Sequence, residues 1–274
     1  MSNLRNALFL PLTLVVLNAS AQDATTKTSN LNGKVSRVSE VVHSADKTIG
    51  KAFNFTKTYL YDESGNRLQW YEDTTKEHYT GWQEICSYED GLLVKVEKYS
   101  RGRQVPAKTL YTYNSDRQRT KADNYDHQGK LFEIETFSYD NHMRLSGLKR
   151  EDVEKQTITS EQYTYDEHNN ISEINYNSGP LTKVKKLYDG ENRVVEEICH
   201  VKKGKGVKID RFVYKYNSHG DIAERITYKD GKSFVTDYTY DLYDSHGNYM
   251  MQYIAINGES PSMQIRREID YFPE

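Results

Sequence analysis

Four histidines recur at one position of a repeated motif and are the first candidates for chemistry. His142, His168, His219 and His246 each lie three residues after a tyrosine of that motif. Zinc binds imidazole nitrogens at ~2.1 Å in tetrahedral sites. Hairpins of one type lie two strands apart, ~9.6 Å, which is too far to share an ion unless the sheet curls sharply. We expect these histidines to decorate turns, with a metal site as the alternative, and predict no bound metal and no cofactor.

Acidic residues are numerous enough to suggest a glycosidase, which needs two carboxylates ~5 to 9 Å apart. They recur as turn residues, however, and the sequence contains no nucleophile elbow, HExxH helix, phosphate-binding glycine loop or EF-hand loop. Cys199 and His200 are neighbours, so their side chains project from opposite faces of a strand. We therefore predict that the protein is not an enzyme.

Two groups of residues are candidates for binding. Trp70 and Trp82 flank one connection, where paired indoles could stack on a sugar ring or pack as a cap on the first repeats. The second group is a basic cluster that could contact a polyanionic glycan or a lipopolysaccharide phosphate, or form a solvated turn. It comprises Lys202, Lys203, Lys205 and Lys208.

The elements that must position these residues are set by a tyrosine motif that occurs eight times. Every copy has Tyr followed by Asp, Asn or Glu, and five copies also have an aromatic residue two positions before that Tyr; the copies recur at intervals of 23 to 28 residues. A period in this range indicates a repeat array. The anchors are Tyr61, Tyr88, Tyr113, Tyr139, Tyr165, Tyr188, Tyr216 and Tyr243.

Each copy has the features of a β-hairpin and its connection. Strand-like runs such as Phe234–Tyr240 alternate between two faces, and polar turns separate them. Asp or Asn after an anchor can bond the backbone two residues on. Three residues further, five copies carry a residue that suits a left-handed backbone: Gly65, Asn169, Asn192, Gly220 and Gly247.

The N-terminal residues predict export. Arg5 precedes the apolar run 8–17, and Ala19, Ser20 and Ala21 form a small-residue cleavage site. The run is too short for a spanning helix, which needs ~20 residues, so we predict no membrane span. The expected organisation is a signal peptide at 1–21, a disordered leader at 22–30 and a repeat domain at 31–274, located in the periplasm or outside the cell.

Composition supports a thin, well-solvated β structure. Hydrophobic residues make up 36% of the chain, but 12% of residues are aromatic and the formal net charge is only −3, which argues against disorder. Interspersed charges give no global field that would attract nucleic acid or an anionic membrane. Cys86 and Cys199 lie about four repeats apart, ~38 Å along a flat sheet, so we predict buried thiols, with a disulfide as the alternative if the sheet closes.

The segment Tyr59–Leu68, with the pattern Tyr-x-Tyr-Asp-x-x-Gly-Asn-Arg-Leu, resembles the YD repeat of rearrangement-hotspot (RHS) proteins, teneurins and toxin-complex shells. The resemblance covers roughly residues 31–272. It implies a β-hairpin array, and some YD regions are associated with carbohydrate binding. The chain is far shorter than the shell-forming members and shows no toxin-domain motif at its end, so we do not expect it to enclose a toxin.

We expect an all-β array of about eight antiparallel hairpin repeats forming a long, curved, twisted sheet or half-shell. About seventeen strands at ~4.8 Å would make a sheet ~80 Å wide, and open sheets beyond about ten strands normally curl or split. Two functions remain open. One is a non-catalytic binding module for a cell-surface glycan or envelope protein, and the other is a structural component of the cell envelope that joins partners by β-edge pairing.

Overall fold

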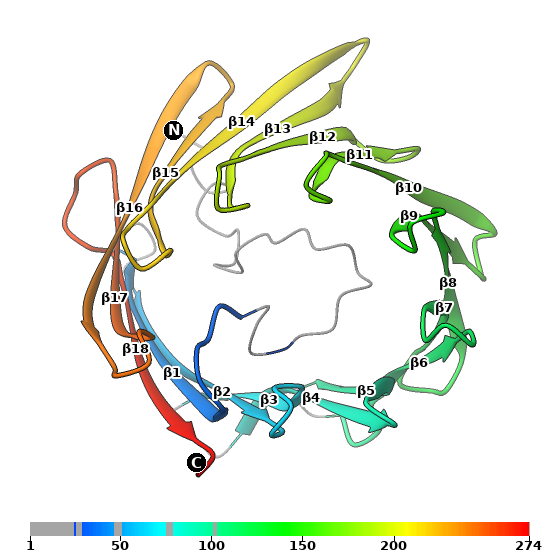
Figure 1. Ribbon diagram of the computed structural model, residues 1–274, viewed down its shortest axis with the longest axis horizontal. Helices are drawn as coiled ribbons and strands as arrows, with labels where there is room; N and C mark the ends of the chain where they lie inside the picture. The colour runs from blue at the N-terminus through cyan, green and yellow to red at the C-terminus, as the bar shows by residue number, and fades with distance from the viewer. Residues whose placement is uncertain (1–24, 26–28, 47–50, 75–78, 101–102, 274) are drawn as a thin grey trace.

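The computed structural model describes residue 25 and residues 29–46, 51–74, 79–100 and 103–273. These residues form eighteen antiparallel strands joined by turns (Figure 1). The strands are β1 (Val35–Asp46), β2 (Lys51–Tyr61), β3 (Arg67–Thr74), β4 (Tyr79–Glu89), β5 (Leu92–Ser100), β6 (Ala107–Tyr113), β7 (Arg119–Tyr125), β8 (Leu131–Tyr139), β9 (Leu145–Asp152), β10 (Thr157–Tyr165), β11 (Ile171–Tyr176), β12 (Leu181–Tyr188), β13 (Val194–Lys203), β14 (Gly206–Tyr216), β15 (Ile222–Lys229), β16 (Lys232–Tyr243), β17 (Tyr249–Ile256) and β18 (Met263–Tyr271).

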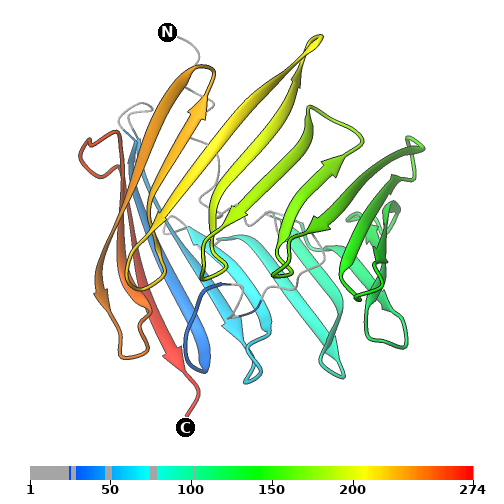
Figure 2. The same ribbon diagram turned by 45° about the horizontal axis from the view of Figure 1, so that its top comes forward.

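The sheet is a closed barrel, so the expected open sheet or half-shell is wrong. Each strand pairs with its two neighbours in sequence, and β1 also pairs with β18, in a ladder that runs from Val35 opposite Tyr271 to Ser44 opposite Met263. Figures 1 and 2 show the resulting ring from two directions. The physical reason is strand twist, which accumulates over many strands until tilt and stagger bring the first strand beside the last.

The inner wall is identified by the segment that precedes β1. Residues 29–34, which we call the N-terminal strap, lie inside the ring in Figure 1. Leu31 of the strap packs with Val38 of β1 and Tyr61 of β2, so these side chains point into the lumen. Residues directly opposite each other in a ladder share a face, and this rule extends the inner wall from Val38 through Tyr59, Trp70, Glu84 and Lys98.

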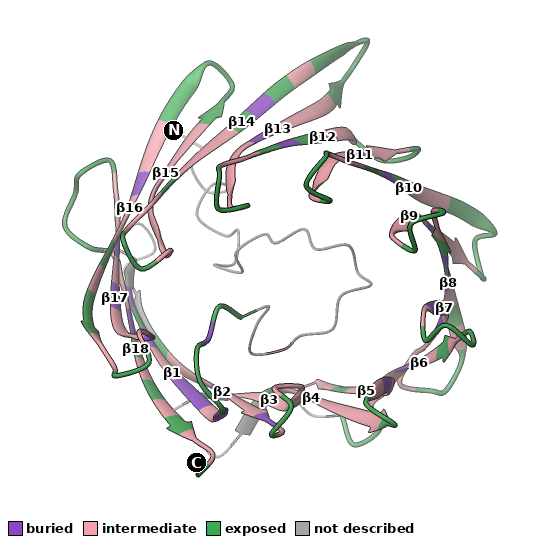
Figure 3. Cartoon of the chain, viewed as in Figure 1, coloured by how far each residue is buried: buried purple, intermediate pink, exposed green. Residues whose placement is uncertain are grey.

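Followed around the ring, the inner wall carries most of the buried side chains, as expected for a concave face. Its largest cluster spans β7 to β12, and burial is concentrated in the wall rather than in the turns (Figure 3). The cluster contains Ala122, Phe137, Leu148, Tyr163, Ile174 and Val184. Among the described residues, the apolar packing is therefore a single layer that lines the wall.

The turns that follow the anchor tyrosines confirm the predicted chemistry. In the turn after Tyr165, the Asp166 carboxylate accepts hydrogen bonds from the N–H groups of His168 and Asn170, both within 2.9 Å. Five predicted positions have a positive φ, from 59° at Asn192 to 84° at Gly220. Arg117 and Met143 occupy the same position in two further copies, with φ of 62° and 63°.

Anchor hydroxyls explain why the repeat uses tyrosine rather than phenylalanine. Tyr165 donates to the carbonyl oxygen of Leu145 at 2.7 Å, which joins one hairpin to the hairpin before it. Each such carbonyl lies beside a bulge that interrupts the ladder. Six anchors make the same bond at 2.7 to 3.0 Å: Tyr88, Tyr113, Tyr139, Tyr165, Tyr188 and Tyr216.

The N-terminal strap is fixed to the rim that carries these turns. The side-chain amide of Asn248 accepts a bond from Asn32 N at 2.8 Å and donates one to Asn32 O at 2.9 Å. Asn30 donates to Asp221, and Thr25 forms an isolated β-bridge with Asn66. The predicted signal peptide, 1–21, and most of the predicted leader lie outside the described residues.

Barrel closure also places the two cysteines. Cys86 lies on β4 and Cys199 on β13, nine strands apart in an 18-stranded ring and therefore on opposite sides. The two are not joined by a disulfide, as predicted, although their side chains are half-buried rather than fully buried. In the part of the chain that the structure describes, no helix is long and apolar enough to cross a membrane.

Candidate functional site

The two tryptophans lie on the inner wall, on adjacent strands. Trp70 of β3 stands between Tyr59 and Glu84, and Trp82 of β4 stands opposite Ser100 of β5. Because Trp82 is two residues from Glu84, the two indoles are diagonal cross-strand neighbours, ~7 to 8 Å apart between backbones. Trp70 is half-buried, whereas Trp82 is 55% exposed.

Polar groups surround this tryptophan pair, which we call the lumenal aromatic site. Glu84 forms an ion pair with Arg67, and the exposed Lys98 lies opposite Glu84. Ser100 bonds the imidazole of His127 at 3.2 Å. The site therefore offers a flat apolar surface beside hydrogen-bonding groups, which is the combination that a small polar ring needs.

Elsewhere the inner wall holds charges in dense networks. Arg150 bridges the carboxylates of Glu135, at 2.8 Å, and Glu161, and Tyr163 donates to Glu161. Burial, followed by the Glu161 hydrogen bond, raises the pKa of Tyr163. Lys186 and Glu197 form a second pair, with Nζ and Oε1 3.4 Å apart, in which both side chains are under 10% exposed. These groups satisfy one another, so they support the wall rather than offer free catalytic groups.

A third network closes the seam between β1 and β18. The Arg267 guanidinium bonds Glu40 at 2.9 Å and stacks over the Tyr249 ring at 3.7 Å. Close by, burial raises the pKa of Asp221, which accepts hydrogen bonds from Tyr243 and Asn30. Sequence patterns did not reveal this network, because Glu40 meets Arg267, and Asn30 meets Asp221, only when the ring closes.

The four histidines all lie in turns, so the prediction that they decorate turns is confirmed. His219 stacks on Tyr243 with ring centroids 3.8 Å apart, and His246 stacks on Tyr271 at 4.1 Å. Among the residues that the structure describes, no group of three or more His, Cys, Asp or Glu side chains is placed to hold a metal ion.

The basic cluster lies in the hairpin formed by β13 and β14, at the rim opposite the one that carries the histidine turns. Lys208 is paired with Asp210 at 2.8 Å and Asp230 at 3.0 Å, and Lys203 is 3.6 Å from Asp230. Lys202 and Lys205 are exposed. The cluster and the lumenal aromatic site are on different parts of the barrel, so they do not form one site.

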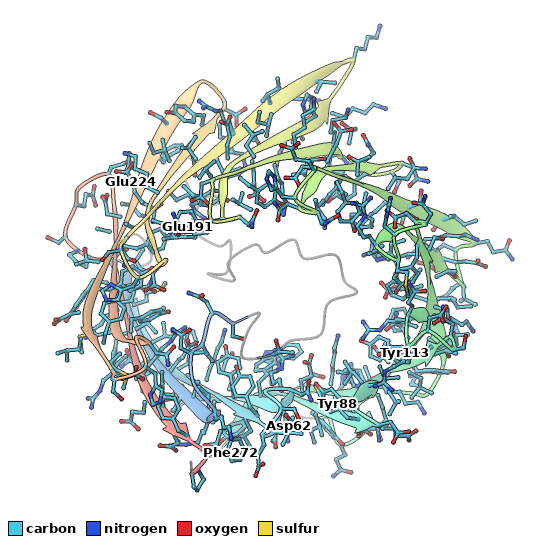
Figure 4. All side chains as sticks on the ribbon, in the orientation of Figure 1. Asp62, Tyr88, Tyr113, Glu191, Glu224 and Phe272 are labelled. Carbon is cyan, nitrogen blue, oxygen red and sulfur yellow. The ribbon has the colours of Figure 1, made fainter. Side chains whose placement is uncertain are left out.

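The outer wall carries ion pairs around the ring. Each pair uses residues one position away from inner-wall residues, which places them on the outside. The side chains shown in Figure 4 extend on both sides of the wall. The outer pairs are Arg37–Asp270, Lys95–Glu97, Lys121–Asp123, Lys149–Glu151, Lys183–Glu173, Arg211–Glu196 and Lys215–Glu224.

Comparison with known proteins finds similar structures but no family. No protein-family model and no curated protein matches the chain. A porin-like protein from Bacteroides uniformis ATCC 8492 aligns over 87% of this chain and 98% of its own, with 12% sequence identity and a TM-score of 0.47. A porin-like protein from Bacteroides vulgatus ATCC 8482 aligns over 88% and 99%, with 10% identity and a TM-score of 0.36.

The comparisons agree only in part with the resemblance to YD-repeat proteins. A chain of the TcdB2-TccC3-Cdc42 structure aligns over 84% of this chain but 16% of its own length, with 12% identity and a TM-score of 0.33. No family model supports membership of the YD-repeat family. The fold assignment rests on the strand pairing itself. The chain is an all-β, closed, 18-stranded antiparallel barrel with structural similarity to Bacteroides porin-like proteins.

Proposed function

We propose that the protein is an exported, non-catalytic barrel of the cell envelope that stays in water and takes a ligand into its lumen. The observation that carries the proposal is the position of Trp82, a large aromatic side chain that faces the lumen and is 55% exposed. Exposed aromatic surface flanked by polar groups is typical of binding sites. The predicted signal peptide supports export.

The outer wall supports a hydrated barrel rather than one embedded in lipid. A lipid-facing Arg or Lys costs about 2 to 4 kcal/mol at the bilayer midplane of a barrel protein. Seven ion pairs are distributed over strands around this ring, including Lys121–Asp123 on β7 and Arg211–Glu196 on β14 and β13. At the midplane their combined cost would match or exceed the stability of an ordinary domain, ~5 to 15 kcal/mol.

A glycan is the ligand class that best suits the lumenal aromatic site. A sugar ring has an apolar face that can stack on the indole of Trp82, and its hydroxyls can bond Glu84 and Lys98. Barrels of 16 to 18 strands enclose an aqueous channel, so an extended chain of sugars would have room to enter. The four basic residues of the β13–β14 hairpin, which lies across the ring from β3 and β4, are not required for this binding.

The test is glycan binding by wild type and by Trp82→Ala, first on an array and then by calorimetry with the best ligand. We expect Trp82→Ala to weaken binding by tenfold or more, taking as the analogue the stacking of a nucleobase on an aromatic side chain, which contributes ~1 to 3 kcal/mol. Phe132→Ala is the matched control, since Phe132 is 42% exposed but faces outward. Equal loss in both variants, or no binding by wild type, would refute a lumenal glycan site.

A structural role in the envelope is the second candidate, favoured by the continuous pairing of the ring. The edge-pairing mechanism is not available to the described strands, because each has a partner on both sides. A structural role would have to use the turns at the two rims or the outer wall. Crosslinking that captures an envelope protein through a rim turn, with no ligand in the lumen, would favour this candidate.

A further inference from the structure

The two hairpins β13–β14 and β15–β16 form a basic and apolar projection on the outside of the barrel. They are adjacent because β14 pairs with β15, and Asp230 of one tip contacts Lys203 and Lys208 of the other. Figures 1 and 2 both show β13–β14 extending past the neighbouring hairpins. We call residues 201–210 and 228–232 together the basic tip.

Charge is concentrated at the basic tip although the whole chain has a net charge of −3. Two aspartates, Asp210 and Asp230, oppose six lysines, which leaves a local net charge of +4. All the lysines except Lys208 are exposed. The six are Lys202, Lys203, Lys205, Lys208, Lys229 and Lys232.

Exposed apolar side chains lie directly beside these lysines. Val207 is 61% exposed, Ile209 is 56% exposed and Tyr228 is 39% exposed. Val207 stands opposite Lys202, and Ile209 stands opposite His200, one position away from the inward-facing Asp210. Val207 and Ile209 are two residues apart on the same face of β14, so they form one exposed apolar strip, and its position next to exposed cations suits a partner that is both anionic and apolar.

We propose that the basic tip docks on the surface of an anionic lipid bilayer. Lysines attract the negative headgroups, and Val207 and Ile209 enter the boundary between headgroups and acyl chains, which is how peripheral proteins combine the two contributions. The barrel would thus be held at a membrane surface by one rim while its charged outer wall stays in water. This docking is independent of any ligand in the lumen.

The exposed apolar side chains, not the charge, favour a lipid surface over a soluble polyanion, because phosphate chains or sulfated glycans would use the lysines alone. Both classes of ligand predict loss of binding in Lys202→Glu/Lys205→Glu. Only a lipid surface predicts loss in Val207→Ser/Ile209→Ser, which leaves the charge unchanged.

The experiment is co-sedimentation of the mature protein with vesicles of phosphatidylcholine, with and without phosphatidylglycerol. We expect binding only to the anionic vesicles, decreasing as sodium chloride is added. Lys202→Glu/Lys205→Glu should lower the partition coefficient by roughly tenfold or more, since each lysine near a surface contributes about fivefold. Val207→Ser/Ile209→Ser should lower it by a similar factor.

Phe132→Ser/Ile158→Ser is the matched control. These residues are also exposed and apolar, at 42% and 50%, but Ile158 stands opposite Glu151 and the nearby turn contains Asp152 and Glu154. The control should bind like wild type, and circular dichroism should show all variants folded. Absence of lipid-dependent binding by wild type would overturn the proposal. So would full binding by Val207→Ser/Ile209→Ser, or an equal loss in the control.

Discussion

The anchor hydroxyls make the sharpest prediction about stability. Tyr165→Phe removes a single oxygen and keeps the ring, so the change isolates the bond from the Tyr165 hydroxyl to the Leu145 carbonyl, which is 2.7 Å long and partly buried. A typical hydrogen bond contributes ~0.5 to 1.5 kcal/mol, and a buried carbonyl left without its partner raises the loss to ~1 to 3 kcal/mol. We expect Tyr165→Phe to lose about 1 to 2 kcal/mol.

Thermal unfolding followed by circular dichroism is a sufficient assay. For a chain of this size, 1 kcal/mol corresponds to a Tm change of ~2 to 4 °C, so the expected decrease is ~2 to 8 °C. Tyr139→Phe should behave alike, because Tyr139 makes the corresponding bond to Arg119 O at 2.8 Å. Tyr228→Phe is the control, since Tyr228 is 39% exposed on the outer wall.

A Tyr165→Phe protein as stable as wild type would refute the reasoning. The same conclusion would follow if Tyr228→Phe were equally destabilised, because the effect would then belong to tyrosine in general. In either case the recurrence of tyrosine at this position would need an explanation outside folding, such as contact between the hydroxyl and a ligand.

Three other perturbations test the seam and the thiols. Burial raises the pKa of Asp221, so ionisation of this carboxyl opposes folding as pH rises. Asp221→Asn should therefore raise the Tm at neutral pH. At a pH well below the ordinary aspartate pKa, the substitution should not raise the Tm. Arg267→Met should cost about 3 to 5 kcal/mol in urea unfolding, because it leaves Glu40, 15% exposed, without its partner, and a loss below 1 kcal/mol would contradict this. Burial, then Glu197 and Asp210, raises the pKa of Cys199 to about 11, so alkylation of Cys199 at pH 8 should be roughly 100-fold slower than in unfolded protein. Equal alkylation rates in folded and unfolded protein would show that the pKa of Cys199 is not raised.

The hairpins were predictable because their signals are local. Asp166, Asn169 and Asn170 lie within five residues and contain the whole turn chemistry, including the left-handed φ of 64° at Asn169. Tyrosine's hydroxyl partner was not predictable, because it bonds a backbone carbonyl about twenty residues earlier, and every residue type has a carbonyl.

The repeat pattern could not predict that the sheet closes into a barrel. The same hairpin unit can build an open sheet or a ring, and the choice depends on the stagger that accumulates over eighteen strands. Only the meeting of β1 with β18 brings Glu40 beside Arg267. The lumenal position of Trp70 and Trp82 likewise could not be foreseen, since a strand pattern separates two faces without showing which one becomes concave.

The pairing of Val35 with Tyr271 means that the order of the hairpins has no structural beginning. The N–H of Phe272 bonds the carbonyl of Lys34 at 2.8 Å, so the two ends of the ring are already within the reach of a short peptide link. A gene rearranged to start at any rim turn would encode the same circle of strands. Insertion of one more hairpin, by contrast, would widen the circumference and shift every wall contact. This architecture therefore tolerates circular permutation better than the addition of a repeat.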